Sequence, residues 1–360
     1  MRENEILHWF GTDPFEAGRE LMKASGQWQN WGRDELIGLK PNLVVAKKAS
    51  SGATTHPAFV AGAISFLQEK GFRRIQILEG SWVGDSTKRA FKVCGYNKLS
   101  DKYDVPLIDL QKNSSVVMES TNGEYRICSS VLQLDRLINM PVLKGHCQTS
   151  LTCALKNLKG CIPDSEKRRY HRMGLHQPIA DLNEIVRADL ILVDGLEGDP
   201  DYEEGGNPVR MNLFFAGTDP VLIDSYAAGL LGLQPEEVAY IGKAAALGIG
   251  SQLSDETKLR YLNKGEAVEG IQRSVAAYRL KEIVREDGAC SACYASLMRA
   301  LSFLEKEDNF PSAPVHIGQG YRGTQVSGVG IGICLKGADS YAKGCPPEAA
   351  EIYRFFKDGS

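Results

Sequence analysis

From Lys40 onward, short runs of β-branched residues alternate with longer amphipathic segments. Residues 42–46 (NLVVA) predict a buried strand, residues 57–71 a helix with proline near its start and glycine at its end, and residues 73–80 the next strand. A strand, a helix and another strand in this order form a βαβ unit, which is built on parallel strands. The sequence therefore predicts an α/β fold with a mostly parallel sheet and flanking helices.

The chain has 360 residues, which is enough for a large domain and a smaller second one. Further strands are predicted at residues 105–110, 137–143, 188–195 and 212–217, and a further helix is predicted at residues 218–232. We expect an α/β domain over residues 1–250 and a charged helical bridge over 251–285. A C-terminal cysteine-containing module is expected over 286–360, where the composition changes.

The bulk composition is that of a globular protein, with 43% apolar and 24% charged residues. The formal net charge of −3 gives no general attraction to nucleic acid. The first residues lack a secretory signal, and no window of about 18 apolar residues occurs. We therefore predict no membrane span and a cytoplasmic location, where the nine cysteines would be ligands or buried thiols rather than disulfides.

Four cysteines lie in the last quarter of the chain: Cys290, Cys293, Cys334 and Cys345. The first two are separated by two residues at the head of a helical stretch, a pattern compatible with half a zinc site, a redox dithiol or half an iron–sulfur site. Cys345 is followed by proline, as in many bacterial cluster-binding runs. Because four soft thiolates complete the ligand shell of one [4Fe–4S] cluster, we predict that cofactor. Zinc and metal-free thiols remain the alternatives.

Cys334 ends a glycine-rich tract, residues 318–334, which is too glycine-dense for the core of a regular strand or helix. Around a cluster, the glycines would let backbone amides approach the sulfur atoms and raise the reduction potential. Ordinary tight turns are the other interpretation of this tract.

Polar side chains follow several of the predicted strands, namely Lys47, Glu79, Lys144, Asp194 and Asp219. Ligands of open parallel sheets bind beyond the carboxyl ends of the strands. We therefore expect these residues to line a ligand site at one edge of the sheet.

The densest polar stretch spans residues 143–163. There Lys144 and His146 are candidates for orienting a ligand or donating a proton, as in a basic cleft that binds a small anion. The other candidate ligand-binding residues are Thr149, Thr152, Lys156 and Asn157, with His171 in a cationic run at 167–176. The competing interpretations are a solvated loop and an exposed charge run, and Cys147, Cys153 and Cys161 are expected to be small buried residues.

An acidic, glycine-rich loop at residues 195–208 follows Asp194. A hard cation such as Mg²⁺ would suit Asp194, Glu197 and Asp219 if the three carboxylates converge. A solvated loop is the alternative.

Several segments carry a family pattern: residues 39–44 (LKPNLV), 55–60 (THPAFV), 140–163 (MPVLKGHCQTSLTCALKNLKGCIP) and 217–233 (GTDPVLIDSYAAGLLGL). From Lys40 to Gly250 the chain resembles the DUF362 family, a set of uncharacterised α/β proteins that often carry an appended iron–sulfur module. The resemblance implies an α/β domain with a cluster segment, although the four cysteines here are spaced more widely than in a compact ferredoxin run. It implies no particular reaction.

The leading functional hypothesis is a redox or electron-transfer protein, in which a cluster exchanges electrons with a ligand of the α/β domain or with a partner protein. The alternatives are a non-redox ligand-binding protein with a structural zinc or cluster module, and a metal-dependent enzyme acting on an anionic metabolite. The sequence contains no phosphate-binding loop, dinucleotide fingerprint or nucleophile elbow, so ATP, NAD and FAD have no support.

Overall fold

The structure, a computed structural model, describes residues 1–265, 271 and 282–358, and the chain in it divides into two compact units. Unit 1 comprises Met1–Ser81, Asp85–Glu166 and the described residues from His176 to Ile271. Unit 2 comprises Trp82–Gly84, Lys167–Leu175 and the described residues from Glu282 onward. Two short segments that lie far upstream in the sequence thus belong with the C-terminal part, which the expected boundary near residue 285 did not include.

Unit 1 is built on an eight-stranded sheet in the order β12-β1-β11-β10-β7-β2-β3-β4. In chain order its strands are β1 (Glu5–Phe10), β2 (Ile37–Pro41), β3 (Ile75–Glu79), β4 (Leu107–Asp109), β7 (Arg136–Met140), β10 (Leu190–Gly198), β11 (Val209–Gly217) and β12 (Lys258–Tyr261). The five strands from β10 to β4 run parallel, β12 is parallel to β1, and β11 is antiparallel to both of its neighbours. The predicted α/β class with a mostly parallel sheet is confirmed.

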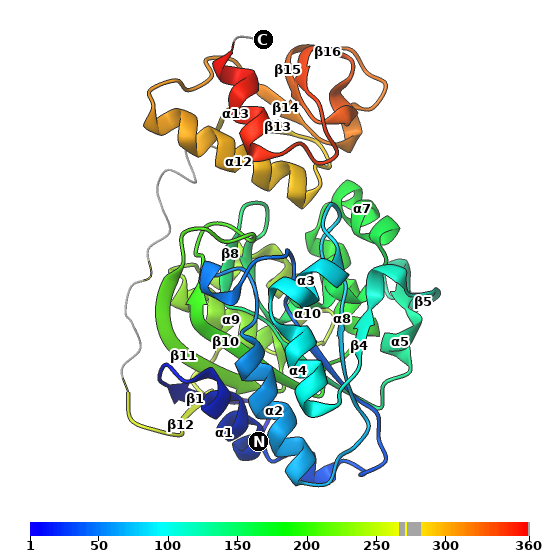
Figure 1. The fold of residues 1–360 in the computed structure, drawn as a ribbon, viewed down its shortest axis with the longest axis vertical. Helices are drawn as coiled ribbons and strands as arrows, with labels where there is room; N and C mark the ends of the chain where they lie inside the picture. The colour runs from blue at the N-terminus through cyan, green and yellow to red at the C-terminus, as the bar shows by residue number, and fades with distance from the viewer. Residues whose placement is uncertain (266–270, 272–281, 359–360) are drawn as a thin grey trace. The chain divides into compact units, whose positions relative to one another are not determined.

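Helices flank this sheet (Figure 1), and unit 1 also contains two small antiparallel ribbons. The helices are α1 (Pro14–Ser25), α2 (Pro57–Glu69), α3 (Thr87–Val93), α4 (Tyr96–Tyr103), α5 (Ser129–Leu132), α6 (Ala154–Asn157), α8 (His176–Ile185), α9 (Pro220–Leu230) and α10 (Ala239–Ala246). The ribbons pair β5 (Ser115–Ser120) with β6 (Gly123–Cys128), and β8 (Lys144–His146) with β9 (Ser150–Thr152).

Helices α1 and α2 lie side by side in Figure 1 and are packed through a pair of glycines. A Cβ on Gly18 would lie 2.1 Å from the carbonyl oxygen of Phe59, and one on Gly62 would lie 2.0 Å from that of Phe15. The two backbones approach too closely for any larger residue. Leu21, Phe59 and the strand residue Leu39 are fully buried in the resulting core.

The predicted strand at residues 42–46 is wrong, because the strand is β2 and it ends at Pro41. Proline has no N–H with which to continue a sheet ladder. The following residues turn inward instead, and the amide of Leu43 donates to the Glu79 carboxylate at 2.7 Å. The apolar run is buried as expected, but as a loop beyond the carboxyl end of the strand.

Unit 2 contains a second, four-stranded sheet, all parallel, formed by β13 (Val284–Glu286), β14 (Val315–Ile317), β15 (Val326–Ile331) and β16 (Ala338–Ala342). Helices α12 (Ser291–Lys306) and α13 (Ala349–Lys357) pack together in this unit (Figure 1). Helix α7 (Asp164–Met173) begins in unit 1 and contributes its residues from Lys167 onward to unit 2.

Two expectations for the C-terminal part differ from the structure. The glycine-rich tract is not wholly irregular, because Val326–Ile331 forms β15, with a bulge that takes up Gly328 at φ +103°. Within the expected helical bridge, residues 258–261 form strand β12, which extends the large sheet beside β1. Residues 266–270 and 272–281 of that bridge lie outside the described residues. Among the described helices, none combines the length and apolar character needed to cross a bilayer.

Candidate functional site

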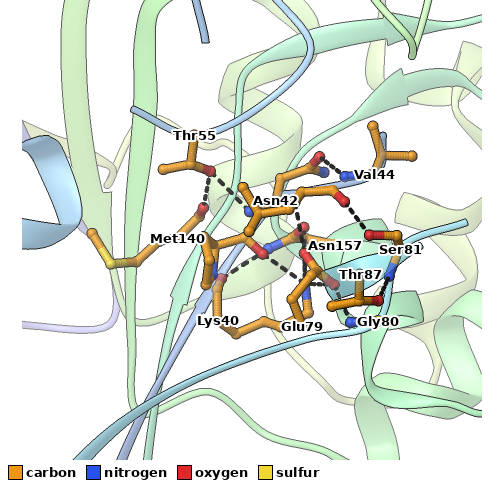
Figure 2. A network of polar contacts seen from close by, with 12 residues as sticks. Lys40, Asn42, Val44, Thr55, Glu79, Gly80, Ser81, Thr87, Met140 and Asn157 are labelled. Carbon is orange, nitrogen blue, oxygen red and sulfur yellow. Dashed lines mark hydrogen bonds and ion pairs between the residues drawn. The ribbon is translucent and has the colours of Figure 1, made fainter. Parts of the chain in front are cut away.

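The carboxyl ends of β2 and β3 hold a buried ion pair between Lys40 and Glu79, whose charged atoms are 2.9 Å apart (Figure 2). The Glu79 carboxylate also accepts hydrogen bonds from the amides of Leu43 and Gly80, each at 2.7 Å. Because these contacts join the ends of both strands and the residues that follow them, Glu79 fixes the loops beyond the two strands. A Cβ at Gly160 would lie 2.1 Å from this carboxylate, so only glycine fits there.

Asn157, at the end of α6, ties that helix to the sheet in the same network. Its side-chain nitrogen donates to the Lys40 carbonyl at 3.2 Å and to the Asn139 side-chain oxygen at 2.7 Å. Thr55 joins two further strand ends, since its hydroxyl accepts from the Asn42 amide and donates to the Met140 carbonyl, both at 2.8 Å (Figure 2). These contacts give Asn157 and Glu79 a positioning role at the strand ends.

Lys144, on β8, is fully buried and directs its ammonium group toward three acceptors. These are the side-chain oxygen of Asn42 at 3.1 Å, the carbonyl of Ala53 at 2.5 Å and the carbonyl of Glu203 at 2.8 Å. Burial lowers the pKa of Lys144 to about 7, and the nearby carboxylate of Glu203 opposes that effect. At neutral pH this amine is close to its titration midpoint.

The carboxylate of Glu203 joins two other predicted site residues. One oxygen contacts the Lys156 ammonium group, and the other lies 3.0 Å from His146 Nε2. Burial alone would raise the pKa of Glu203, but the charge of Lys156 and the contact with His146 hold it well below the usual value. Glu203 is therefore an anion inside the protein, held by groups from β8 and α6.

His146 is neutral, with its proton on a defined nitrogen. Its Nδ1 accepts the backbone amides of Gln148 and Thr149, each at 3.0 Å, so the ring proton sits on Nε2 and points at Glu203. Burial lowers the pKa of His146 to about 3. The Thr149 hydroxyl donates to the Leu151 carbonyl at 3.2 Å.

Helix α6 is placed by Asp224 of α9, whose carboxylate accepts the amides of Ala154 and Leu155 at 2.6 and 3.1 Å. These bonds place Lys156 so that its ammonium group contacts Glu203 and donates to the Thr152 hydroxyl at 3.2 Å. Burial raises the pKa of Asp224 to about 7.

Lys47 donates to the Glu204 carbonyl at 2.8 Å, so it holds the same loop as Lys144. The Glu204 side chain is buried, and within the described residues its Oε2 has no hydrogen-bond partner. Burial raises the pKa of Glu204 to about 7. Glu203 and Glu204 were not among the predicted site residues. The sequence did contain a signal for their role, because the acidic DPDYEEGG run is opposite in charge to the lysines of the predicted site.

The three carboxylates considered for Mg²⁺ have different surroundings. Asp194 accepts from the backbone amide of His56 at 2.8 Å and faces His56 Nδ1 at 2.9 Å, and Glu197 lies 3.6 Å from the other ring nitrogen. Asp219 caps α9 by accepting the amides of Val221 and Leu222, and it also accepts the Ser251 amide at 2.7 Å. Asp194 and Glu197 thus share His56, and among the residues that the structure describes the three carboxylates form no metal-binding group.

In unit 2, the four predicted cysteines line one cavity, together with Gln319 and Arg322. Cys290 is the N-cap residue of α12, Cys293 lies in the first turn, Cys334 lies just after β15 and Cys345 follows β16. Burial, and then the neighbouring thiols Cys290, Cys345 and Cys334, raise the pKa of Cys293. The structure therefore brings together four residues that are spread over 56 positions of the sequence, from 290 to 345.

Two side chains approach the sulfur atoms from one short turn. Gln319 Nε2 lies 3.6 Å from Cys290 Sγ, and Arg322 Nε lies 3.3 Å from Cys334 Sγ. Gly332 lies next to Cys293 and has φ +83°, a left-handed backbone conformation that favours glycine. Sequence reasoning did not single out Gln319 or Arg322.

Within the described ranges, no three or more His, Cys, Asp or Glu side chains form a group that could hold a metal ion. A single ion requires all its ligands within about 2.3 Å of one point. In a [4Fe–4S] cluster each thiolate binds a different iron, so the thiols stand farther apart.

His171 lies on the part of α7 that belongs to unit 2, whereas the other predicted ligand-binding residues belong to unit 1. Its Nε2 is 3.3 Å from the Ser291 hydroxyl, next to Cys290. From the same helix, Arg168 lines the cysteine cavity. The cationic run thus accompanies the cysteines and not the Lys144 group.

The family model described as a domain of unknown function, DUF362, matches residues 37–229, which is more than half of the chain. This chain belongs to the DUF362 family. A thylakoid-associated protein of Synechocystis sp. is 24% identical over 264 residues, which cover 68% of this chain and 80% of that protein.

Among solved structures, the lactate racemase apoprotein from Thermoanaerobacterium thermosaccharolyticum is similar, with a TM-score of 0.40 and 9% identity. The match covers 61% of this chain and 55% of that one, so this chain spans little more than half the length of that structure.

Proposed function

We propose that this DUF362 protein is an iron–sulfur protein in which Cys290, Cys293, Cys334 and Cys345 hold one [4Fe–4S] cluster. The observation that carries the proposal is the common cavity lined by these four side chains. Thiolates are the ligands such clusters require, and the cavity contains the full set of four. A location that keeps thiols reduced, such as the cytoplasm, is part of the proposal, since all nine cysteines are free.

The surrounding residues fit the charge of such a group. Four thiolates and a cluster together are anionic, and Arg322 and Arg168 supply positive charge at the cavity wall. Gln319 and Arg322 would donate hydrogen bonds to ligand sulfurs, and the start of α12 adds the positive end of a helix dipole beside Cys290 and Cys293. A bound cluster would supply one-electron exchange, which makes electron transfer the activity we propose.

The proposal also gives unit 1 an anion-binding role. The supporting observation is that Lys156 and the Nε2–H of His146 contact the Glu203 carboxylate, while Lys144 donates to the backbone carbonyl of the same residue. The donors come from two elements that follow the sheet's carboxyl edge, where ligands of such folds bind. This role and the cluster are tested separately.

The cluster is tested by anaerobic purification, followed by iron and sulfide analysis and electron paramagnetic resonance. We expect about four irons and four sulfides per chain and a brown colour that dithionite bleaches. Each Cys→Ser change at positions 290, 293, 334 and 345 should lower the iron content and change the spectrum. Cys94→Ser is the matched control, because the Cys94 thiol is in unit 1 and donates to the Lys47 carbonyl at 3.0 Å, a bond that a hydroxyl can replace.

A colourless protein that contains stoichiometric zinc would contradict the cluster and favour a structural module with a non-redox ligand-binding function. Equal iron loss in the Cys94→Ser control would also contradict the assignment of the four ligands.

A further inference from the structure

The loop between β10 and β11, residues 199–208, turns into unit 1 and presents Glu203 to three buried cationic or N–H donor groups. Lys156 contacts one carboxylate oxygen, His146 Nε2–H contacts the other at 3.0 Å, and Lys144 holds the carbonyl of the same residue at 2.8 Å. Each oxygen of a planar carboxylate thus meets its own donor. This is the two-point geometry by which proteins recognise a carboxylate.

We propose that Lys144, His146 and Lys156 form a binding site for the carboxylate of a small organic acid, and that Glu203 occupies this site as a built-in substitute. The inference deepens the anion-binding role proposed for unit 1 and rests on it. The bound acid would take the place of the Glu203 side chain when the loop moves away. The ligand class is a carboxylate because His146 and Lys156 hold a carboxylate here, and Lys144 adds a donor that now holds the adjoining carbonyl.

The donors also have contacts outside the loop, although the Gly145 amide of β8 donates to the Asp199 carbonyl of the loop at 2.7 Å. Lys144 and His146 are placed by the β8–β9 ribbon, and Lys156 is placed by α6 through the cap from Asp224. The tautomer of His146 is set by the amides of Gln148 and Thr149, not by Glu203. The site therefore keeps its donors in position when Glu203 leaves.

Burying this loop has an energetic cost, which favours replacement of the Glu203 side chain by a ligand. Asp199 and Glu204 are buried with it, and burial raises the pKa of both carboxyl groups. Glu204 Oε2 has no hydrogen-bond partner among the residues described by the structure. A buried carboxyl oxygen without a partner disfavours the closed state.

The loop can move as a unit, because the hydrogen bonds within it can persist when the bonds that anchor it to other segments break. Asp199 accepts the amides of Asp201, Tyr202 and Asn207 at 2.8–2.9 Å, all within the loop. The anchors to other segments include the bonds from Gly145 N to the Asp199 carbonyl at 2.7 Å and from Gly206 N to the Ser51 carbonyl at 3.0 Å. The Asp199 amide also donates to the Gly52 carbonyl at 3.3 Å, and Lys47 donates to the Glu204 carbonyl at 2.8 Å. Loop opening would expose the amides of Gly145 and Gly206.

The first experiment measures acetate binding by calorimetry in carboxylate-free buffer. Glu203→Ala, which empties the site, should bind acetate at least tenfold more tightly than the unchanged protein. Glu204→Gln is the matched control, since it removes the neighbouring carboxylate but leaves the one held by Lys156 and His146, and it should show no gain. Inorganic phosphate, a tetrahedral anion, should gain less than acetate.

The second experiment uses the unchanged protein and does not depend on the folding of a variant. Saturating acetate should speed hydrogen exchange at the amides of Gly145 and Gly206, because the displaced loop releases both anchors. Equal acetate affinity of the unchanged protein and Glu203→Ala, without faster exchange, would overturn the substitute role and leave the anion site standing. No anion binding to either protein would overturn both, whereas iron content reports on the cluster alone.

Discussion

Gln319 and Arg322 are the residues whose chemistry is most closely coupled to the proposed cluster. Both belong to a turn that Asp287 fixes, because the Gly320 amide donates to the Asp287 carbonyl at 3.0 Å. A side chain at position 320 would collide with the Asp287 carboxylate, since a Cβ would lie 1.9 Å from one of its oxygens. The turn therefore presents two N–H donors to two cysteine sulfurs from a defined position.

Arg322→Gln should lower the reduction potential of the cluster. In the proposed cluster the guanidinium would stabilise the extra negative charge of the reduced state, both by charge and by its bond to Cys334. Loss of about 1.4 kcal/mol of this stabilisation corresponds to about 60 mV for one electron. The measurement is a dithionite titration followed by electron paramagnetic resonance.

Arg354→Gln provides the control for Arg322→Gln, since it removes the same charge from α13, where Arg354 donates to the Ala350 carbonyl. An intact cluster with equal potentials in both variants would show that Arg322 has no tuning role. Absence of iron from the unchanged protein would instead reject the cluster itself.

At the scale of elements, β1 carries an unusual buried histidine. His8 lies among the rings of Phe10, Phe215, Tyr226 and Tyr261, and it is 1% exposed. Within the described residues, neither of its ring nitrogens has a hydrogen-bond partner. Burial lowers the pKa of His8 to about 4 from 6.5.

His8 should make unit 1 sensitive to acid. Between pH 6.5 and 4 the unfolded chain binds a proton at this residue and the folded chain does not, so the free energy of unfolding falls as the pH drops through that window. The full effect of this shift is about 3 kcal/mol. His8→Phe should abolish this part of the pH dependence, and it should raise the stability at pH 5 more than at pH 8.

Urea unfolding of the unchanged protein and His8→Phe at pH 5, 6, 7 and 8 measures the difference. His146 also has a lowered pKa and contributes a slope of the same sign in both proteins, so only the difference between the two curves reports on His8. Parallel curves would mean that His8 is not buried as a neutral ring.

Elements with strong hydrophobic periodicity could be predicted from the sequence. Elements whose structure depends on tertiary contacts could not. Helix α2 was predicted at residues 57–71 and spans Pro57–Glu69, because proline and glycine mark its ends. Strand β1 was missed, since its pairing with β11 and β12 comes from segments more than 200 positions away. Strand β15 was missed because its glycines are tolerated only by a bulged, partly buried strand.

The candidate sites show the same division. The four cysteines could be named from spacing and thiolate chemistry, and they line one cavity. Lys144, His146 and Lys156 were also named, but their partner Glu203 could not be, because a charge in a glycine-rich loop usually faces solvent. Only the folded chain shows that this loop turns inward.

At the scale of the whole molecule, the two units contain separate sheets and separate cores. In unit 2 the core includes Leu297 and Leu301 of α12, Ile317 of β14 and Ile331 of β15. This core is small. Of the four cysteines that would bind the cluster, two lie at the start of α12 and the other two lie on either side of β16 in the sequence. A metal centre that joins points so far apart in the chain contributes directly to the folding free energy of the unit that holds it.

Removal of iron by a chelator under mild oxidation should therefore unfold unit 2 before unit 1. For a unit of this size, a loss of about 2 kcal/mol lowers the melting temperature by roughly 10 °C. Hydrogen exchange read by mass spectrometry should show faster exchange in β14 and β15, with protection in β2 and β7 retained. Equal loss of protection in both sheets would mean that the units unfold as one, and unchanged protection in β14 and β15 would mean that unit 2 folds without the cluster. In the second case the cysteines would serve electron exchange alone, because their contribution to stability would be absent.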